Sequence, residues 1–88
     1  MKPVAELTAS VLIPAFNEEA KIAETVRAVQ KIPGVKQIIV VDDGSTDHTG
    51  QEAENAGATV IRAEINRGKG GALNLGLASA HGEYLLLL

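Results

Sequence analysis

Short apolar runs alternate with amphipathic segments along this 88-residue chain. The runs are rich in aliphatic residues, which is typical of strands buried on both faces of a sheet. They cover residues 11–13, 38–41, 59–61 and 84–88. The segments between them predict helices, since Ile22, Val26 and Val29 recur at helical spacing, as do Leu73 and Leu77 in the last segment. This order predicts an α/β fold of four mainly parallel strands with helices on both faces.

Polar residues and glycines predict where the helices begin and end. Asn17 is expected to cap the first helix, with Glu18 in its first turn, where negative charge suits the helix dipole. Ser45 or Thr46 is expected to cap the second helix. Gly57 is expected to end that helix in a left-handed conformation, which glycine adopts easily.

Composition narrows the function classes. The net charge is −3 and the chain has one Phe, one Tyr and no Trp, which argues against a nucleic-acid-binding protein. It has no cysteine, so it has no disulfide and no thiolate metal site, which suits a reducing cytoplasm. No stretch approaches the ~20 apolar residues that span a bilayer, and residues 1–6 do not resemble a secretory signal. We therefore expect a cytoplasmic protein without a membrane segment, or a part of one that lies at the inner face of a membrane.

Two carboxylates follow the second predicted strand directly. In open parallel sheets, ligands bind at the carboxyl ends of the strands, so Asp42 and Asp43 are candidate ligand contacts. Neighbouring strand residues face opposite ways, and we assign Asp43 to a base and Asp42 to a supporting or ribose role. A carboxylate can accept the ring N–H of uracil or of guanine, so the residues leave both nucleotides open. The alternative is that both aspartates only solvate a turn and cap a helix.

A glycine-rich loop at residues 66–71 carries two cations, Arg67 and Lys69. Bare backbone, positive charge and a following helix make it a candidate diphosphate site. It matches neither the Walker loop nor the dinucleotide-binding fingerprint, and a solvated surface loop is the alternative. His48 and His81 are isolated and expected at the surface, and no zinc spacing or nucleophile elbow occurs.

Together, three segments resemble the amino-terminal half of the family 2 glycosyltransferases, which are inverting enzymes with the GT-A fold. The segments are residues 14–19, residues 41–47 and residues 66–70. The resemblance implies a three-layer, Rossmann-like half-domain and a nucleotide-sugar donor, most often a UDP-sugar and in some members a GDP-sugar. Asn17-Glu18-Glu19 and Gly68-Lys69-Gly70 look most like polyprenyl-phosphate sugar transferases within the family.

The resemblance also implies which residues bind the donor. They are Pro14, Ala15, Asn17 and Glu18 of the first loop, Asp42 and Asp43 after the second strand, and Lys69 near the base or the diphosphate. In the family, an Asp-x-Asp motif that binds Mg2+ or Mn2+ follows the strand that corresponds to residues 84–88. This chain ends before that motif and before the catalytic base, so we expect it to contain no metal ligand and no catalytic residue.

The expected domain is therefore residues 1–88, the nucleotide-binding part of a transferase that is inactive alone. One alternative is a stand-alone nucleotide-binding or interaction module. A sugar-1-phosphate nucleotidyltransferase is disfavoured, because its glycine-rich loop would follow the first strand directly, where Pro14-Ala15-Phe16-Asn17 stands here. The strand at residues 84–88 is expected at a sheet edge, where an exposed apolar strand favours self-association.

Overall fold

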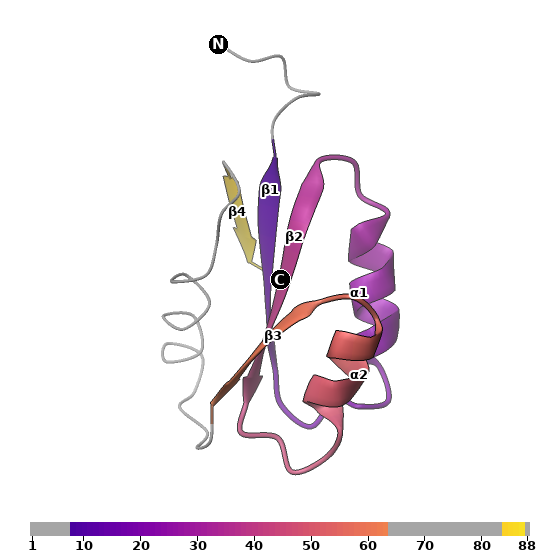
Figure 1. The fold of residues 1–88 in the computed structure, drawn as a ribbon, viewed down its shortest axis with the longest axis vertical. Coiled ribbons are helices and arrows are strands. Elements are labelled where there is room, and N and C mark those ends of the chain that lie inside the picture. The colour runs from indigo at the N-terminus through magenta and orange to yellow at the C-terminus, as the bar shows by residue number, and fades with distance from the viewer. Residues whose placement is uncertain (1–7, 64–83, 88) are drawn as a thin grey trace.

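The computed structural model describes residues 8–63 and 84–87 of the chain. Its elements are, in chain order, β1 (Ala9–Ala15), α1 (Ile22–Gln30), β2 (Val35–Asp43), α2 (Thr49–Asn55), β3 (Thr59–Ala63) and β4 (Tyr84–Leu87). All four predicted strands are present, and α1 and α2 lie between the first three of them (Figure 1). The loop at residues 66–71 and the helix predicted after it lie outside the described residues.

The four strands form one sheet in the order β3-β2-β1-β4, and each neighbouring pair is parallel. The predicted parallel sheet is therefore confirmed, with β4 as an outer strand of the described sheet. In the β1–β2 register, Ala15 lies opposite Asp42, so the two strands end almost level. The loops after β1 and β2 consequently leave the sheet side by side at its carboxyl edge, which is the lower end in Figure 1.

Alternate strand residues pack into separate clusters on the two sides of the sheet. On one side, β1 and β2 pack against α1 and α2, and the largest members of this cluster are Val11, Ile13, Ile22, Val26, Val29, Ile38 and Val40. On the other side, Leu12, Ile39 and Val41 form a second buried cluster, with Ile61 against it. Both described helices thus cover the same side, and the predicted helix on the other side would fall among residues that are not described.

The first helix begins later than the sequence suggests. α1 begins at Ile22, with Lys21 at its N-cap position and no capping side chain. Asn17 lies four residues before Lys21 in the connecting loop, with a φ of 51°. The predicted Asn17 cap is therefore wrong, because the side chain of Asn17 makes its hydrogen bonds to a different loop, as described below.

The predicted cap of the second helix is also wrong. α2 begins at Thr49, with His48 at its N-cap position, so neither Ser45 nor Thr46 caps it. The predicted end is confirmed, because Gly57 has a φ of +107° just after the helix. Its N–H donates to the Glu54 carbonyl at 3.0 Å, and the next N–H donates to the Ala53 carbonyl at 3.1 Å. This pair of bonds is the Schellman motif, which satisfies the last carbonyls of a helix.

Replacing Gly57 tests this helix end. In Gly57→Ala, the new Cβ would lie 2.7 Å from Nε2 of Gln30, in a backbone conformation that L-residues avoid. We expect the free energy of unfolding to fall by about 1–2 kcal/mol, measured by urea denaturation. Gln51→Ala, at an exposed position of α2, is the control and should stay within about 0.5 kcal/mol of the wild type. Equal stability of Gly57→Ala and wild type would contradict the prediction.

Candidate functional site

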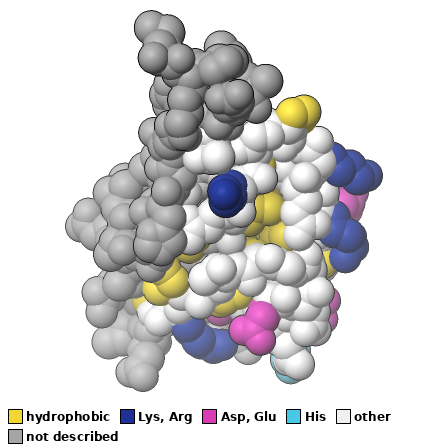
Figure 2. Space-filling model, turned by 45° about the horizontal axis from the view of Figure 1, so that its top comes forward, with side chains coloured by type: hydrophobic (Ala, Val, Ile, Leu, Met, Phe, Trp, Pro, Cys, Tyr) yellow, Lys and Arg dark blue, Asp and Glu magenta, His cyan; other side chains and the backbone are white. Residues whose placement is uncertain are grey.

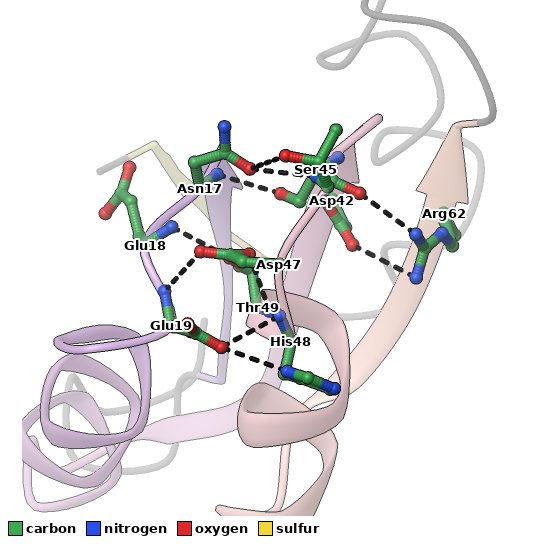
Figure 3. A network of polar contacts seen from close by, with 10 residues as sticks. Asn17, Glu18, Glu19, Asp42, Ser45, Asp47, His48, Thr49 and Arg62 are labelled. Atoms are coloured by element: carbon green, nitrogen blue, oxygen red, sulfur yellow. Dashed lines mark hydrogen bonds and ion pairs between the residues drawn. The ribbon is translucent and has the colours of Figure 1, made fainter.

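Hydrogen bonds join the loops that follow β1 and β2. Three consecutive backbone N–H groups of the first loop donate to side-chain oxygens of the second loop and of the start of α2 (Figure 3). The pairs are Asn17 N to Ser45 Oγ at 2.9 Å, Glu18 N to Thr49 Oγ1 at 2.8 Å and Glu19 N to Asp47 Oδ2 at 3.2 Å. These N–H groups lie beyond β1 and before α1, so neither element provides their acceptors.

Hydrogen bonds also run from the second loop back to the first. The Oδ1 atom of Asn17 accepts the backbone N–H of Thr46 at 2.9 Å and the hydroxyl of Thr46 at 3.3 Å. The Oε2 atom of Glu19 accepts the backbone N–H of His48 at 3.0 Å and lies 3.2 Å from Nδ1 of the same histidine. Because each loop supplies acceptors for the other, the position of one determines the position of the other.

Asp47 and Thr49 form the centre of these contacts. Asp47 Oδ1 accepts the backbone N–H of Thr49 at 2.9 Å and also its hydroxyl. The hydroxyl of Thr49 in turn accepts the N–H of Glu18. Desolvation raises the pKa of Asp47, but the hydrogen bonds from Thr49 and Glu19 together outweigh it and hold this pKa below its ordinary value. The ionised form of Asp47 is therefore the one that joins the loops.

The two adjacent aspartates at the end of β2 lie on opposite sides of the sheet. Asp42 is on the side of Val40, which α1 and α2 cover, and Asp43 is on the side of Val41. Asp42 is 0% exposed and Asp43 is 7% exposed. Pro14 pairs with Val41 in the register of the sheet, so it shares the side of Asp43.

Asp42 is enclosed by its own turn and by α2. Its Oδ1 atom accepts the backbone N–H of Ser45 at 3.0 Å, which closes the turn after β2. The helix passes so near that a Cβ at Gly50 would lie 3.0 Å from Oδ2 of Asp42. The carboxylate of Asp42 has no exposed surface, and its bond to the N–H of Ser45 fits the expected supporting role.

The structure brings six of the predicted site residues to one edge of the sheet: Pro14, Ala15, Asn17, Glu18, Asp42 and Asp43. The seventh, Lys69, lies outside the described residues. Ala15 is only 3% exposed, which leaves little of its side chain for a ligand. The side chain of Asn17 is engaged with Thr46. Glu18 is exposed, and Figure 3 shows its carboxylate turned away from the contacts between the loops.

Sequence reasoning did not predict the roles of four residues at this edge. Ser45, Asp47 and Thr49 hold the first loop, and the signal for them was the run of short polar side chains after β2. Phe16 is 45% exposed directly after β1. The signal for it was a large aromatic residue placed just beyond the strand, where burial in the core of the sheet ends.

A separate hollow lies on α1 and is lined by Lys21, Glu24, Thr25, Ala28 and Val29. Among residues 8–63 and 84–87, no group of three or more His, Cys, Asp or Glu side chains could hold a metal ion. Within the same ranges, no helix has the length and apolar character needed to cross a membrane. On the face in Figure 2, the described Lys and Arg side chains are dispersed among Asp and Glu, so they form no continuous basic stripe there.

The lowered pKa of Asp47 predicts an acid-sensitive contact between the loops. A carboxylate whose pKa is depressed by folding stabilises the fold above the pKa of the unfolded chain, near the ordinary value of 3.8. That stabilisation is lost as the pH falls through the lower pKa of the folded state. We expect Asp47→Asn to be less stable at pH 7 and to lose less stability between pH 6 and pH 3 than the wild type, measured by urea denaturation.

Glu54→Gln, on the exposed side of α2, is the matched control for this pH series. It should retain the acid dependence of the wild type. An Asp47→Asn variant whose stability follows the wild-type pH dependence would show that Asp47 does not contribute as described.

Comparison with known proteins identifies the family. The family model described as glycosyl transferase family 2 matches residues 10–88. An uncharacterised protein of Methanocaldococcus jannaschii is 50% identical over 70 residues, which cover 80% of this chain and 28% of that protein. Glucosyl-3-phosphoglycerate synthase of Mycobacterium tuberculosis is 36% identical over 90 residues, which cover 92% of this chain and 28% of the synthase. This chain thus spans less than a third of the length of these curated relatives.

Solved structures agree with this result. The crystal structure of the Mycobacterium tuberculosis synthase with Mn2+, UDP-glucose and phosphoglyceric acid matches with a TM-score of 0.80 and 35% identity. The match covers 96% of this chain and 33% of the synthase chain. The expected Rossmann-like GT-A architecture is confirmed by these structural relatives and by the parallel sheet. The chain belongs to glycosyltransferase family 2.

Proposed function

We propose that this chain is the donor-nucleotide-binding part of an inverting glycosyltransferase. The complete enzyme would transfer a sugar from a nucleotide-diphosphate sugar to an acceptor hydroxyl or a lipid phosphate. The observation that carries this proposal is the placement of Pro14 and Asp43 on one side of the sheet, at its carboxyl edge. The loops that follow these residues are hydrogen-bonded to each other, so the edge is preorganised for a ligand.

Asp43 is the proposed contact for the base. A carboxylate accepts hydrogen bonds only, so it suits a base with a ring N–H, such as uracil or guanine. Phe16 offers an exposed aromatic face one residue beyond β1, on which a base could stack. Glu18 has an exposed carboxylate that is not engaged with the second loop, which suits a contact to ribose hydroxyls.

Uridine is the proposed nucleoside. Structures of the Mycobacterium tuberculosis synthase contain UDP or UDP-glucose together with Mn2+ or Mg2+. The similarity to that synthase covers 96% of this chain and 33% of the synthase chain. This similarity favours a UDP-sugar over a GDP-sugar, which the carboxylate alone does not separate. Lys69 is proposed to lie near the base or the diphosphate.

Nucleoside binding and metal binding are assigned to different parts of the complete enzyme. A bound divalent metal ion would stabilise the departing diphosphate during a single displacement at the anomeric carbon. The described residues contain no metal-binding cluster, so we assign this ion to ligands elsewhere in the complete enzyme. The residues described here bind and orient the nucleoside, and we propose that residues 1–88 alone have no transferase activity.

Isothermal titration calorimetry of the chain with UDP and with CDP tests the base contact. Cytosine has no N–H at ring position 3, so an acceptor-only carboxylate should favour UDP. We expect Asp43→Ala to weaken UDP binding by about 10- to 100-fold, which corresponds to the loss of one hydrogen bond to a charged group. Asp43→Asn should narrow the preference for UDP over CDP, because an amide both donates and accepts hydrogen bonds.

Glu54→Gln, at an exposed position near the C-terminal end of α2, is the matched control and should bind UDP like the wild type. Circular dichroism would establish that each variant is folded. A folded wild-type chain that binds neither UDP nor GDP, with or without Mn2+, would refute the proposed function of this chain. UDP binding that is unchanged in Asp43→Ala would refute the role of Asp43 alone.

A further inference from the structure

The buried carboxylate of Asp42 is only partly satisfied within its own turn. Asp42 is 0% exposed, and its Oδ1 atom accepts the N–H of Ser45. Its Oδ2 atom is buried and has no hydrogen-bond partner among the described residues. An ionised carboxylate in such a place is unfavourable unless a positive charge compensates it. Asp42 therefore needs a nearby positive charge.

Arg62 on the neighbouring strand provides that charge. In the β2–β3 register, Arg62 lies directly opposite Asp42, and its Nη1 atom is 3.7 Å from Oδ2 of Asp42. Its Nη2 atom donates a hydrogen bond to the backbone carbonyl of Ser45 at 3.0 Å (Figure 3). One guanidinium group thus contacts both the first and the last residue of the turn from Asp42 to Ser45.

The three residues form a closed ring of contacts. Asp42 accepts a hydrogen bond from the N–H of Ser45, and Arg62 donates one to the carbonyl of Ser45. Arg62 also forms an ion pair with the carboxylate of Asp42. Asp43 lies inside this turn and on the opposite side of the sheet. The hydroxyl of Ser45 accepts the N–H of Asn17, so the ring is also connected to the first loop.

We propose that Arg62 is a positioning residue for nucleotide binding, which holds the turn from Asp42 to Ser45 so that Asp43 meets the base. This inference rests on the proposed function. Arg62 acts through Asp42 and Ser45, and needs no contact with the nucleotide. Its side chain is 58% exposed, and an ion pair between two exposed groups would contribute little. Here the partner is fully buried, so removal of the arginine leaves an uncompensated charge inside the protein.

The planar guanidinium group suits this position better than an ammonium group. Two of its nitrogens point to two different acceptors, which one compact ammonium group cannot reproduce in the same geometry. Arg62→Lys should therefore keep the attraction to Asp42 but weaken the contact with the carbonyl of Ser45. Arg62→Met keeps the apolar stem of the side chain and removes both interactions.

Two measurements on the same variants test the proposal. The first is the dissociation constant for UDP by calorimetry, and the second is hydrogen exchange of the backbone amide of Ser45 by NMR. We expect Arg62→Met to weaken UDP binding by about tenfold and to speed up exchange at Ser45. Exchange in the buried strands, for example at Ile13 and Val40, should speed up less than exchange at Ser45. Arg62→Lys should retain more UDP affinity than Arg62→Met and should show slower exchange at Ser45 than Arg62→Met.

Arg27→Met is the matched control, because Arg27 is an exposed arginine in the last turn of α1. It should leave both measurements unchanged. A second test uses Asp42→Asn, which removes the buried charge and keeps an oxygen for the N–H of Ser45. In that background, Arg62→Met should cost much less affinity than it does alone, since the two residues interact directly.

The outcomes separate this inference from the proposed function. If the wild type binds no nucleotide, the proposed function fails, while exchange at Ser45 still reports whether Arg62 holds the turn. If Arg62→Met leaves both Ser45 exchange and UDP affinity unchanged, the positioning role is overturned. Faster exchange at Ile13 and Val40 to the same extent as at Ser45 would also overturn it, because Arg62 would then stabilise the whole fold rather than the turn.

Discussion

The geometry of the carboxyl edge of the sheet depends on where three backbone N–H groups find their acceptors. Residues 17–19 have left β1 and have not yet entered α1, so their N–H groups have no partner in either element. The side chains of Ser45, Thr49 and Asp47 accept all three. The bonds of Asn17 and Glu18 are partly buried, where an unpaired N–H group is unfavourable. The first loop therefore takes its course from the second, and the two cannot vary independently.

The adjacent aspartates show how one strand end can place two neighbouring carboxylates in different surroundings. Successive residues of a strand face opposite sides of the sheet, so Asp42 lies under α2 while Asp43 lies on the other side. Asp42 uses its position to close the turn through Ser45. The same turn contains Asp43, so a buried carboxylate without access to solvent supports the turn that carries the proposed base contact.

Much of the fold could be predicted because buried parallel strands are short aliphatic runs, and the sequence shows four of them. The helix caps could not be predicted from the sequence. Asn17 and Ser45 were expected to cap helices because their side-chain oxygens accept backbone N–H groups. They do accept such groups, but from each other's loop, 28 and 29 residues away in the chain. Local sequence indicates that a residue suits this bond, and only the tertiary structure determines its partner.

Arg62 shows a second limit of the same kind. In the sequence it is one charged residue in a short predicted strand, and nothing nearby relates it to Asp42. The register between β2 and β3 places them opposite each other, and register depends on packing across the whole sheet. A strand that supplies none of the proposed ligand contacts thus contacts the turn that carries the proposed base contact, Asp43. A change in the packing of β3 would consequently alter the contacts of Arg62 with Asp42 and Ser45, and through them the position of Asp43.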